Sequence, residues 1–449
     1  MTDLISAAAR SHPNALAFDD GTRKVTYTEL QTHLTGESGV GQGERVIWCS
    51  KNDWNSLLTF WKLQSTGCVA CPISERFPEE KRNAIAKQLD AQWLSKYSHD
   101  SRASESPYQA DPESPATIIL SSGSTGTPKA IVHSIAAHIA SATGAATNIP
   151  LGPGDRWLWS LPLYHVSGLS ILVRCAVAGA TVVGIHETEQ LSAELLRKRR
   201  ITHLSVVSTQ LRRLLASKQF PGPELKSVLL GGSSVQPKLV TQARERGVAV
   251  HTTYGLTEMA SQVTTSTSEC DPTTSGRVLP GCELVVDDGE ILVRGETLCL
   301  GYYRDGEIQT AVDDDGWFHT RDRGSLNAKG QLTVAGRIDN MFISGGENIY
   351  PESIERALLG LSGVEQAVVV PKPDEEFGAR PVAFVKGELP LDWESQLRNS
   401  LRGFEVPTQI LDWPTHAELG IKPDRKKLCK MVGDFTLPPG ESGSQAQKG

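Results

Sequence analysis

Short β-branched runs alternate with amphipathic segments along most of the chain. The run SVLL at 227–230 is typical of a buried strand, and the turn-like sequence GGSSVQP follows it. KLVTQARER then has the hydrophobic spacing of a helix that ends at Gly247, and VAVHTTYG has the composition of a second strand. A strand, a helix and a strand in this order predict a parallel sheet. Ligands of parallel sheets lie beyond the carboxyl ends of the strands, where we expect Gly232, Ser233 and Gly255.

The pattern changes from about Glu283 onward. ELVVDDGEILVRG predicts a β-hairpin whose turn is formed by Asp288 and Gly289. Further along, Pro351 opens a predicted helix over YPESIERALLGL. EQAVVVP and RPVAFVKG predict two strands, and WESQLRNSLRGF predicts another helix, so this part has the pattern of a compact α+β unit. The hydrophobic face of the helix after Pro351 would consist of Ile354, Ala357, Leu358 and Leu361.

These patterns predict an α/β fold with two domains. We expect residues 1–338 to form a large N-terminal domain with mixed and parallel sheets, helices and a β-rich subdomain, and 339–449 to form a small, mobile α+β C-terminal domain. The Ser- and Pro-rich stretch 98–115 is expected to be an exposed loop, and the tail 436–449 to be disordered. The hydrophobic stretch 157–185 contains Pro, His, Gly and Arg, which favours a core strand, loop and core helix over a membrane span.

Charge and cysteine content narrow the class of protein. The chain of 449 residues has 45 Lys and Arg against 52 Asp and Glu, which gives a formal charge of −7. This mild acidity argues against nucleic-acid binding and favours an enzyme for small molecules. The first residues lack the pattern of a secretory signal, so we expect a soluble, cytoplasmic protein without a membrane span, and a homo-oligomer is left open. Cys68 and Cys71 form a C-x-x-C pair, which we interpret as small buried residues rather than a metal or redox site.

The sequence SSGSTGTPK at 121–129 has the composition of a phosphate-binding loop. Its glycines permit close approach of the backbone, its hydroxyls and N–H groups suit a polyphosphate, and its lysine adds positive charge. It departs from the Walker pattern because Pro128 precedes the lysine. Taken alone, the loop is explained equally well as a solvated turn. The candidate ATP-binding residues here are Ser121, Ser122, Gly123, Ser124, Thr125, Gly126, Thr127 and Lys129.

The segment TTYGLTEM at 252–259 carries a second set of candidates. Tyr254 suits stacking on a base, and Thr257 suits a hydrogen bond to a phosphate. Glu258 is the candidate metal ligand, because Mg²⁺ is commonly held by one or two carboxylates together with phosphate oxygens. A plain turn at the end of a strand is the alternative.

Three further charged residues lie in loop-like sequence toward the C-terminus. Asp322 in TRDRG and Arg337 in GRIDN suit the hydroxyls of a ribose, and Lys422 in LGIKPDRKKL suits the negative charge that develops on a phosphate. Each alone would be interpreted as a surface salt bridge or a surface lysine.

In this order, S-S-G-S-T-G-x-P-K, Y-G-x-T-E, T-x-D-x-G, G-R-x-D and K-x-x-R resemble the motifs of the acyl-adenylate-forming superfamily, over most of the chain. The resemblance implies a two-step reaction with Mg²⁺, in which a carboxylate and ATP give an acyl-AMP and a thiol, usually coenzyme A, displaces AMP. It further implies that Lys422 bridges the carboxylate and the α-phosphate, although Ile421 stands where the family usually has glycine. The resemblance also places Asp339 at a hinge, about which the small domain would exchange Lys422 for a thiolation face that includes SGGEN.

The same resemblance gives roles to the other motif residues. Glu258 would carry Mg²⁺, Thr257 would contact the α-phosphate, and Tyr254 would lie against adenine. Asp322 and Arg337 would hold the ribose, and the loop at 121–129 would hold the two phosphates that leave as pyrophosphate.

The sequence LPLYHVSGLSILVRCAVAGA at 161–180 bears on the identity of the carboxylic acid substrate. Arg174 stands among apolar residues, where an unpaired guanidinium is costly, so its partner is either a protein carboxylate or a second carboxylate of the substrate. H-V-S-G-L-S-I-L-x-R, with VVSTQLRRLL later, resembles the o-succinylbenzoate–CoA ligases of menaquinone biosynthesis. That resemblance implies that Arg174 holds the ring carboxylate and that His165 gates the acyl pocket. Ser208 and Thr209 are additional candidates for that pocket, with a strand-end turn as the alternative.

Three other functions stay open at this point. The chain could be another aryl- or acyl-CoA ligase of the superfamily, whose monocarboxylate substrate would leave Arg174 without a role in binding. It could also be a stand-alone adenylation module that acylates a carrier protein. A non-catalytic nucleotide-binding protein is disfavoured because both Glu258 and Lys422 are present.

Overall fold

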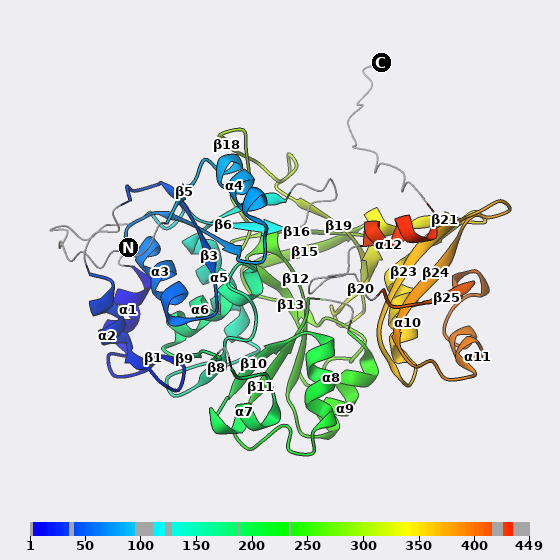
Figure 1. The fold of residues 1–449 in the computed structure, drawn as a ribbon, viewed down its shortest axis with the longest axis horizontal. Helices are drawn as coiled ribbons and strands as arrows, with labels where there is room; N and C mark the ends of the chain where they lie inside the picture. Colours follow the sequence, from blue (N-terminus) through cyan, green and yellow to red (C-terminus); the bar gives the residue numbers. More distant parts are fainter. Residues whose placement is uncertain are drawn as a thin grey trace.

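The computed structural model describes residues 3–35, 40–94, 111–121, 128–186, 188–232, 235–414 and 425–433. Two large sheets with their helices form most of the molecule, and a smaller antiparallel sheet joins them to the C-terminal part (Figure 1). The C-terminal part, drawn in orange and red, lies at the opposite end of the molecule from helix α1 (Leu4–Ser11). This arrangement confirms the predicted α/β fold class. The division into domains 1–338 and 339–449, and the mobility of the second, stay predictions.

The largest sheet is parallel at its centre. Its strands are β1 (Leu16–Asp19), β2 (Lys24–Thr26), β8 (Arg156–Leu158), β9 (Thr181–Val183), β10 (His203–Val206), β11 (Ser227–Leu230), β12 (Val250–Leu256), β13 (Ser261–Thr265) and β14 (Arg277–Val278). Their spatial order is β14-β13-β12-β11-β10-β8-β9-β1-β2. The pairs from β12 to β1 are parallel, and the outer pairs are antiparallel. The predicted strand 227–230 and its parallel neighbour are therefore confirmed.

Four helices connect successive parallel strands from β8 to β12: α6 (Val166–Ala178), α7 (Ala193–Lys198), α8 (Ser208–Ala216) and α9 (Pro237–Glu245). Helices α2 (Tyr27–His33) and α5 (Ile135–Ala146) link this sheet to the second one, and α1 precedes β1. Helix α9 begins with Pro237, whose fixed φ suits a first turn, and the left-handed Gly247 follows its end. Buried side chains cover both faces of the sheet, with Phe18 and Trp157 in one cluster and Leu204 and Val228 in the other.

A second sheet carries the two strands that flank the glycine-rich loop. Its strands are β3 (Arg45–Ser50), β4 (Val69–Ser74), β5 (Gln92–Trp93), β6 (Pro115–Ser121), β7 (Lys129–Ser134), β17 (Gly301–Arg304) and β18 (Glu307–Gln309), in the order β18-β17-β7-β6-β4-β3-β5, and α3 (Trp54–Ser65) and α4 (Glu79–Gln88) accompany them. Strands β6 and β7 are antiparallel, and Ser121 pairs with Lys129 at the end of this hairpin where the chain passes from β6 to β7. Cys68 and Cys71 are free and buried at β4, which confirms their interpretation as small buried residues.

The β-rich part is a four-stranded antiparallel sheet of β15 (Cys282–Asp287), β16 (Glu290–Gly295), β19 (Phe318–Leu326) and β20 (Leu332–Arg337). The hairpin predicted around Asp288 and Gly289 is confirmed, since β15 and β16 pair on either side of them. Both turn residues have positive φ, 42° and 79°, as the favoured two-residue hairpin turn requires.

The C-terminal part contains β21 (Phe342–Ser344), β22 (Glu347–Ile349), α10 (Pro351–Gly360), β23 (Val364–Asp374), β24 (Gly378–Gly387), α11 (Trp393–Arg398), β25 (Gln409–Asp412) and α12 (Arg425–Val432). The helix predicted after Pro351 is confirmed, and its Ile354, Leu358 and Leu361 are buried. The helix predicted over 393–404 is shorter, because α11 ends at Arg398 and a 3₁₀ turn, η3 (Gly403–Glu405), follows. Asn399, Ser400 and Gly403 are weak helix formers, which explains the early end.

The hydrophobic stretch 157–185 folds as the core strand, loop and core helix that were predicted, with β8, α6 and β9 in sequence. Within the described ranges, none of the helices combines the length and the hydrophobicity that a bilayer crossing needs. Most of the stretch 98–115 and all of the tail 436–449 lie outside the described residues, although Pro115 already belongs to β6.

Candidate active site

The chain from Tyr254 to Ser261, called the 254–261 segment below, connects β12 to β13 through the 3₁₀ turn η1 (Thr257–Met259). It doubles back on itself so tightly that a Cβ on Gly255 would lie 1.9 Å from the Ser261 carbonyl oxygen. Ala260 and Ser261 both have positive φ, 50° and 136°, conformations that cost non-glycine residues free energy. The segment lies at the carboxyl end of β12, where the sequence predicted a ligand edge.

The ribose candidates form one connected group that begins at this segment. The Tyr254 hydroxyl donates a 2.7 Å hydrogen bond to Oδ2 of Asp322, and Nη1 of Arg337 lies 3.3 Å from Oδ1 of the same carboxylate. Arg337 also donates a 2.8 Å hydrogen bond from Nη2 to Asp339, the hinge candidate. Asp322 and Arg337 are directly paired residues of β19 and β20. The structure therefore brings four predicted residues together.

Burial and nearby charges shift the pKa values of Tyr254 and Arg337. Burial of Tyr254, followed by the nearby Asp322 carboxylate, raises the pKa of its hydroxyl well above the usual value. Burial alone would lower the pKa of Arg337, but Asp322 and Asp339 outweigh it and raise that pKa. The tyrosine therefore remains a hydrogen-bond donor and the guanidinium remains charged near neutral pH.

Thr257 and Glu258 are held from the second sheet. His133 of β7 donates a 2.6 Å hydrogen bond from Nε2 to the Thr257 carbonyl oxygen, and the N–H of Cys299 donates one of 2.7 Å to the Glu258 carbonyl oxygen. The Tyr302 hydroxyl donates a 3.0 Å hydrogen bond to Oε1 of Glu258. The turn that carries the predicted metal ligand is therefore anchored to both large sheets.

The donor set around Glu258 fits a magnesium ion that arrives with a nucleotide. Among the described residues, no group of three or more His, Cys, Asp or Glu side chains forms a complete metal cage. A lone carboxylate suits Mg²⁺, which keeps several waters and takes further oxygens from phosphates. Glu258 is half-buried and so remains within reach of such a ligand.

The phosphate-loop candidates are only partly described. Ser121 and Lys129 close the β6–β7 hairpin, and the Lys129 ammonium lies over the Tyr302 ring, 5.1 Å from its centroid. Gly232 follows β11 with a φ of 80°. The candidates Ser122, Gly123, Ser124, Thr125, Gly126, Thr127, Ser233 and Lys422 lie outside the described residues.

Arg425 is the first described residue after Lys422, and its guanidinium contacts helix α10. Its Nη1 lies 2.7 Å from Oε1 of Glu355 on α10, and its Nη2 lies 3.5 Å from Oε1 of Glu352. Burial raises the pKa of Glu355 in spite of the adjacent guanidinium. Arg425 therefore fixes the start of α12 to the core of the C-terminal part.

Arg174 lies within α6 and is only 4% exposed. Its Nη2 donates a 3.2 Å hydrogen bond to the hydroxyl of Ser261, and its guanidinium carbon lies 5.4 Å from the centroid of the Trp157 ring. Among the described residues, no Asp or Glu forms an ion pair with Arg174, and its buried Nε has no hydrogen-bond partner. Burial lowers its pKa to about 10, so the group is still a cation at neutral pH. Of the two partners considered from the sequence, a protein carboxylate is therefore not found in the described part of the chain.

The remaining acyl-pocket candidates lie at helix starts beside the same sheet. His165 is exposed and precedes the first residue of α6, with its ring 4.7 Å from that of Tyr164. Ser208 and Thr209 are the first two residues of α8, directly after β10, and both are half-buried. Ser208 and Thr209 therefore begin a helix and do not form the plain strand-end turn that was the alternative.

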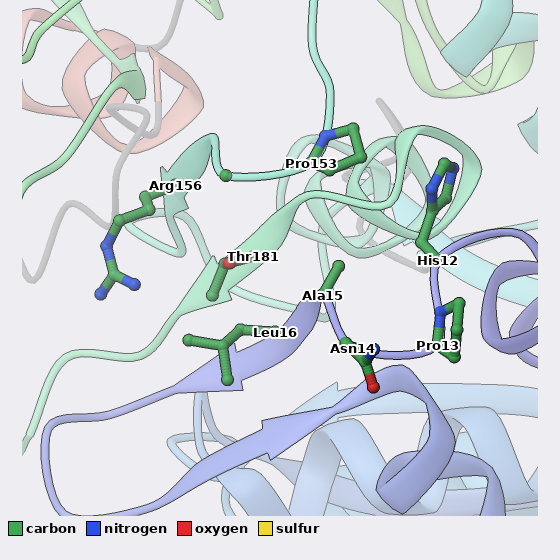
Figure 2. A pocket seen from close by; sticks show the side chains of 9 residues that line it. His12, Pro13, Asn14, Ala15, Leu16, Pro153, Arg156 and Thr181 are labelled. Atoms are coloured by element: carbon green, nitrogen blue, oxygen red, sulfur yellow. The ribbon is translucent and has the colours of Figure 1, made fainter.

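A separate cavity of about 520 Å³ lies at the amino ends of β1, β8 and β9, opposite the ligand edge (Figure 2). Its lining includes His12 and Arg156, and the side chain of Arg156 points away from His12 (Figure 2). Arg156 is already paired with Asp19 at 2.9 Å. None of the predicted site residues lines this cavity.

Sequence reasoning missed several residues that contact the candidates, among them His133, Ser261 and Tyr302. Tyr302 is the first tyrosine of GYYR, a sequence that indicates only a strand. His133 follows the hydrophobic run AIV, and Ser261 stands three residues after Glu258. Each contact joins elements that are far apart along the chain, so no local pattern could have identified it.

Comparison with known proteins gives one family, whose two models match separate parts of the chain. The model of the AMP-binding enzyme family matches residues 88–303, and that of the AMP-binding enzyme C-terminal domain matches residues 353–412. A 2-succinylbenzoate--CoA ligase of Salmonella typhimurium is 39% identical over 416 residues, which cover 88% of each chain.

Two solved structures extend the similarity to the fold. A single-residue variant of Escherichia coli MenE with bound OSB-AMS has 32% sequence identity and a TM-score of 0.84, and the match covers 96% of this chain and 98% of the other. The o-succinylbenzoate coenzyme A synthetase (MenE) of Bacillus subtilis in complex with ATP and magnesium ion has 25% identity and a TM-score of 0.82, over 92% and 96% of the two chains.

Proposed function

The chain belongs to the AMP-binding enzyme family, and from that membership we propose that it ligates o-succinylbenzoate to coenzyme A in menaquinone biosynthesis. The enzyme is an acid–thiol ligase that consumes ATP and releases AMP and pyrophosphate. The relatives named 2-succinylbenzoate--CoA ligase, and the similar structure that holds ATP and magnesium, support both the reaction and its co-substrates.

The reaction has two steps. In the first, an oxygen of the succinyl carboxylate attacks the α-phosphorus of ATP, and the bond from that phosphorus to the β-phosphate oxygen breaks, which releases pyrophosphate. In the second, the sulfur of coenzyme A attacks the acyl carbon and the carbon–oxygen bond to AMP breaks, while the thiol proton passes to solvent. Neither the adenylation step nor the thiolation step requires an oxidant or a reductant.

Charge neutralisation is the main task of the first step, because a carboxylate and a triphosphate repel each other. A bound Mg²⁺ supplies positive charge to the phosphate oxygens, and Glu258 would hold it. Lys422 would lie between the carboxylate and the α-phosphate. Asp322 and Arg337 would orient the ribose, a role that their direct pairing across β19 and β20 supports.

The observation that carries the choice of acid is Arg174. A guanidinium in an apolar site is unfavourable unless a charged or strongly polar partner arrives. Among the described residues, its only hydrogen-bond partner is the neutral hydroxyl of Ser261. The ring carboxylate of o-succinylbenzoate would complete the pairing, and the fork of the guanidinium matches a carboxylate in bidentate fashion.

The test of this function is a pyrophosphate-release assay with two acids. We expect o-succinylbenzoate to be used at least about a hundredfold more efficiently, in kcat/KM, than its analogue without the ring carboxylate, because a buried charged site rejects a ligand that leaves it unpaired. Equal use of the two acids would show another aryl- or acyl-CoA ligase. Coenzyme A and a carrier-bound pantetheine would be compared as acceptors, since preference for the carrier would show an adenylation module.

The movement of the C-terminal part belongs to the same proposal. A swing about Asp339 would withdraw Lys422 after adenylation and present residues 344–348 for thiolation. Asp339 accepts hydrogen bonds from Arg321 and Arg337, so the nucleotide-binding group and the hinge share a residue. A cytoplasmic location is also proposed, because ATP and coenzyme A are intracellular co-substrates, and cell fractionation would test it.

A further inference from the structure

Tyr302 lies between two residues that are predicted to handle ATP. Its hydroxyl donates the 3.0 Å hydrogen bond to Oε1 of Glu258, and its ring lies beneath the ammonium of Lys129. Lys129 begins β7, and Tyr302 pairs with Ile131 of that strand from the neighbouring β17. One side chain therefore contacts both the cation at the end of the 121–129 loop and the carboxylate of the 254–261 segment.

The main chain around Glu258 is already fixed by other contacts. The Thr257 carbonyl accepts a hydrogen bond from His133, and the Glu258 carbonyl accepts one from the N–H of Cys299. These two main-chain contacts do not fix the side chain of Glu258. Holding a glutamate side chain in one rotamer costs conformational entropy, so a further contact is needed. The Tyr302 hydroxyl is in place to select one orientation of the carboxylate before any ligand arrives.

The chemistry of this contact fixes its direction. The Tyr302 hydroxyl carries a proton that it can donate, whereas an ionised carboxylate only accepts. This hydrogen bond occupies one acceptor site of Oε1 and leaves the other acceptor sites of the carboxylate for an ion.

We infer that Tyr302 is a positioning residue for the metal–nucleotide complex. It holds the Glu258 carboxylate in one orientation and keeps the Lys129 ammonium over its own ring. It acts through these two residues and does not itself take part in bond making. The inference rests on the proposed function in that it takes an ATP site at Glu258 as given, and it adds a residue that neither the motifs nor the family resemblance identified.

Tyr302→Phe tests the inference, because it removes the hydroxyl and keeps the ring beneath Lys129. The matched control is Tyr303→Phe, the adjacent tyrosine on the other face of β17, whose ring contacts the Arg45 guanidinium at 4.8 Å. Mn²⁺ would be used as the metal probe and its binding to the enzyme with ATP, without acid, followed by electron paramagnetic resonance. We expect the Mn²⁺ dissociation constant to rise about tenfold in Tyr302→Phe and to be unchanged in Tyr303→Phe.

ATP binding in the presence of EDTA separates positioning from damage to the site. Tyr302→Phe should bind ATP without metal as the wild type does, since the adenosine contacts are intact. Unfolded protein would lower the number of Mn²⁺ sites and leave the dissociation constant of the folded fraction unchanged. An Mn²⁺ affinity equal to that of the control would overturn the inference.

The same measurements separate this inference from the proposed function. Metal and nucleotide binding are followed without any acid, so their dependence on Tyr302 does not require that o-succinylbenzoate be the substrate. An enzyme that binds Mn²⁺ with ATP in a Tyr302-dependent way, yet fails to use o-succinylbenzoate, would refute the acid assignment alone. An enzyme that uses o-succinylbenzoate but whose metal affinity ignores Tyr302 would refute the positioning role alone.

Discussion

Arg174 donates a 3.2 Å hydrogen bond from Nη2 to the hydroxyl of Ser261, which belongs to the same segment as Glu258. The contact joins the residue proposed to recognise the acid to the segment proposed to handle the nucleotide. Ser261 offers Arg174 a neutral oxygen, which orients the guanidinium but does not neutralise it. The proposed acid would therefore meet a cation whose charge is not neutralised by the described residues.

Arg174→Ala should raise the KM for o-succinylbenzoate by about tenfold to a hundredfold and leave the KM for ATP nearly unchanged. The reason is the loss of a charge-assisted pair with the ring carboxylate. Steady-state kinetics with both substrates would measure the effect, and the exposed Arg213→Ala on α8 is the matched control. The analogue without the ring carboxylate should be used at least as well by the variant as by the wild type, because the variant has no buried guanidinium to leave unpaired. An unchanged KM for o-succinylbenzoate in a folded variant would refute the assignment.

Lys422→Ala should lower the rate of acyl-AMP formation by at least about a hundredfold, because the cation between the two anions is lost. Thiolation of supplied acyl-AMP should be largely retained. The two half-reactions would be measured separately, by pyrophosphate release and by coenzyme A consumption, with the exposed Lys426→Ala as control. Equal loss in both half-reactions would contradict a role confined to adenylation.

Arg425→Ala should destabilise the protein by about 3–5 kcal/mol, because Glu355 would be left buried without its partner. Chemical denaturation would measure the loss of free energy of unfolding, and Lys426→Ala should cost little. Since Arg425 fixes the chain just after Lys422, adenylation should decline more than thiolation. A variant as stable as the control would mean that the ion pair does not hold α12 in place.

The free energy of unfolding should fall as the pH decreases from about 6.5 toward 4. Burial lowers the pKa of His133 to about 4, and burial followed by His133 lowers that of His138. An unfolded histidine takes up a proton below about pH 6.5, whereas His133 in the folded protein stays neutral, so the unfolded state binds more protons in this window. From pH 7 to pH 5 the share of His133 is on the order of 2 kcal/mol.

Denaturant unfolding at pH 7, 6 and 5 would measure this dependence, and His133→Gln isolates the share of one residue. Buried His203 and His251 also have lowered pKa values and contribute to the total, so the comparison is between variant and wild type. The variant should lose less stability between pH 7 and 5 than the wild type. Identical pH profiles would mean that His133 is protonated with an ordinary pKa in the folded protein.

The sequence predicted those elements whose signals are local. The strand at 227–230 was located correctly because all four of its residues are buried, and Pro351 marked the start of α10. The hairpin at Asp288 and Gly289 followed from turn chemistry alone. Helix α11 was predicted too long because its hydrophobic spacing continues to Phe404 beyond the point where weak helix formers end it.

In the candidate site, too, the residues of local motifs were predicted, whereas the contacts between distant segments were not. The motifs identified Tyr254, Asp322 and Arg337, and the structure joins them by hydrogen bonds and pairing. The contacts of His133 and Tyr302 with η1 arise from the way in which two sheets meet, which a linear pattern does not contain. Whether Arg174 has a protein carboxylate beside it was likewise open until its surroundings were described.

The tight path of the 254–261 segment bears on any attempt to change the acid that the enzyme accepts. Tyr254 at its start contacts Asp322, Glu258 lies in its middle, and Ser261 at its end contacts Arg174. A substitution that shifts the backbone of the segment would therefore disturb the proposed nucleotide, metal and acid contacts together. Redesign of specificity is better begun on α6, whose side chains can change while the segment keeps its backbone. An enzyme selected for a new acid should therefore accumulate its substitutions on that helix and retain Gly255 and Ser261.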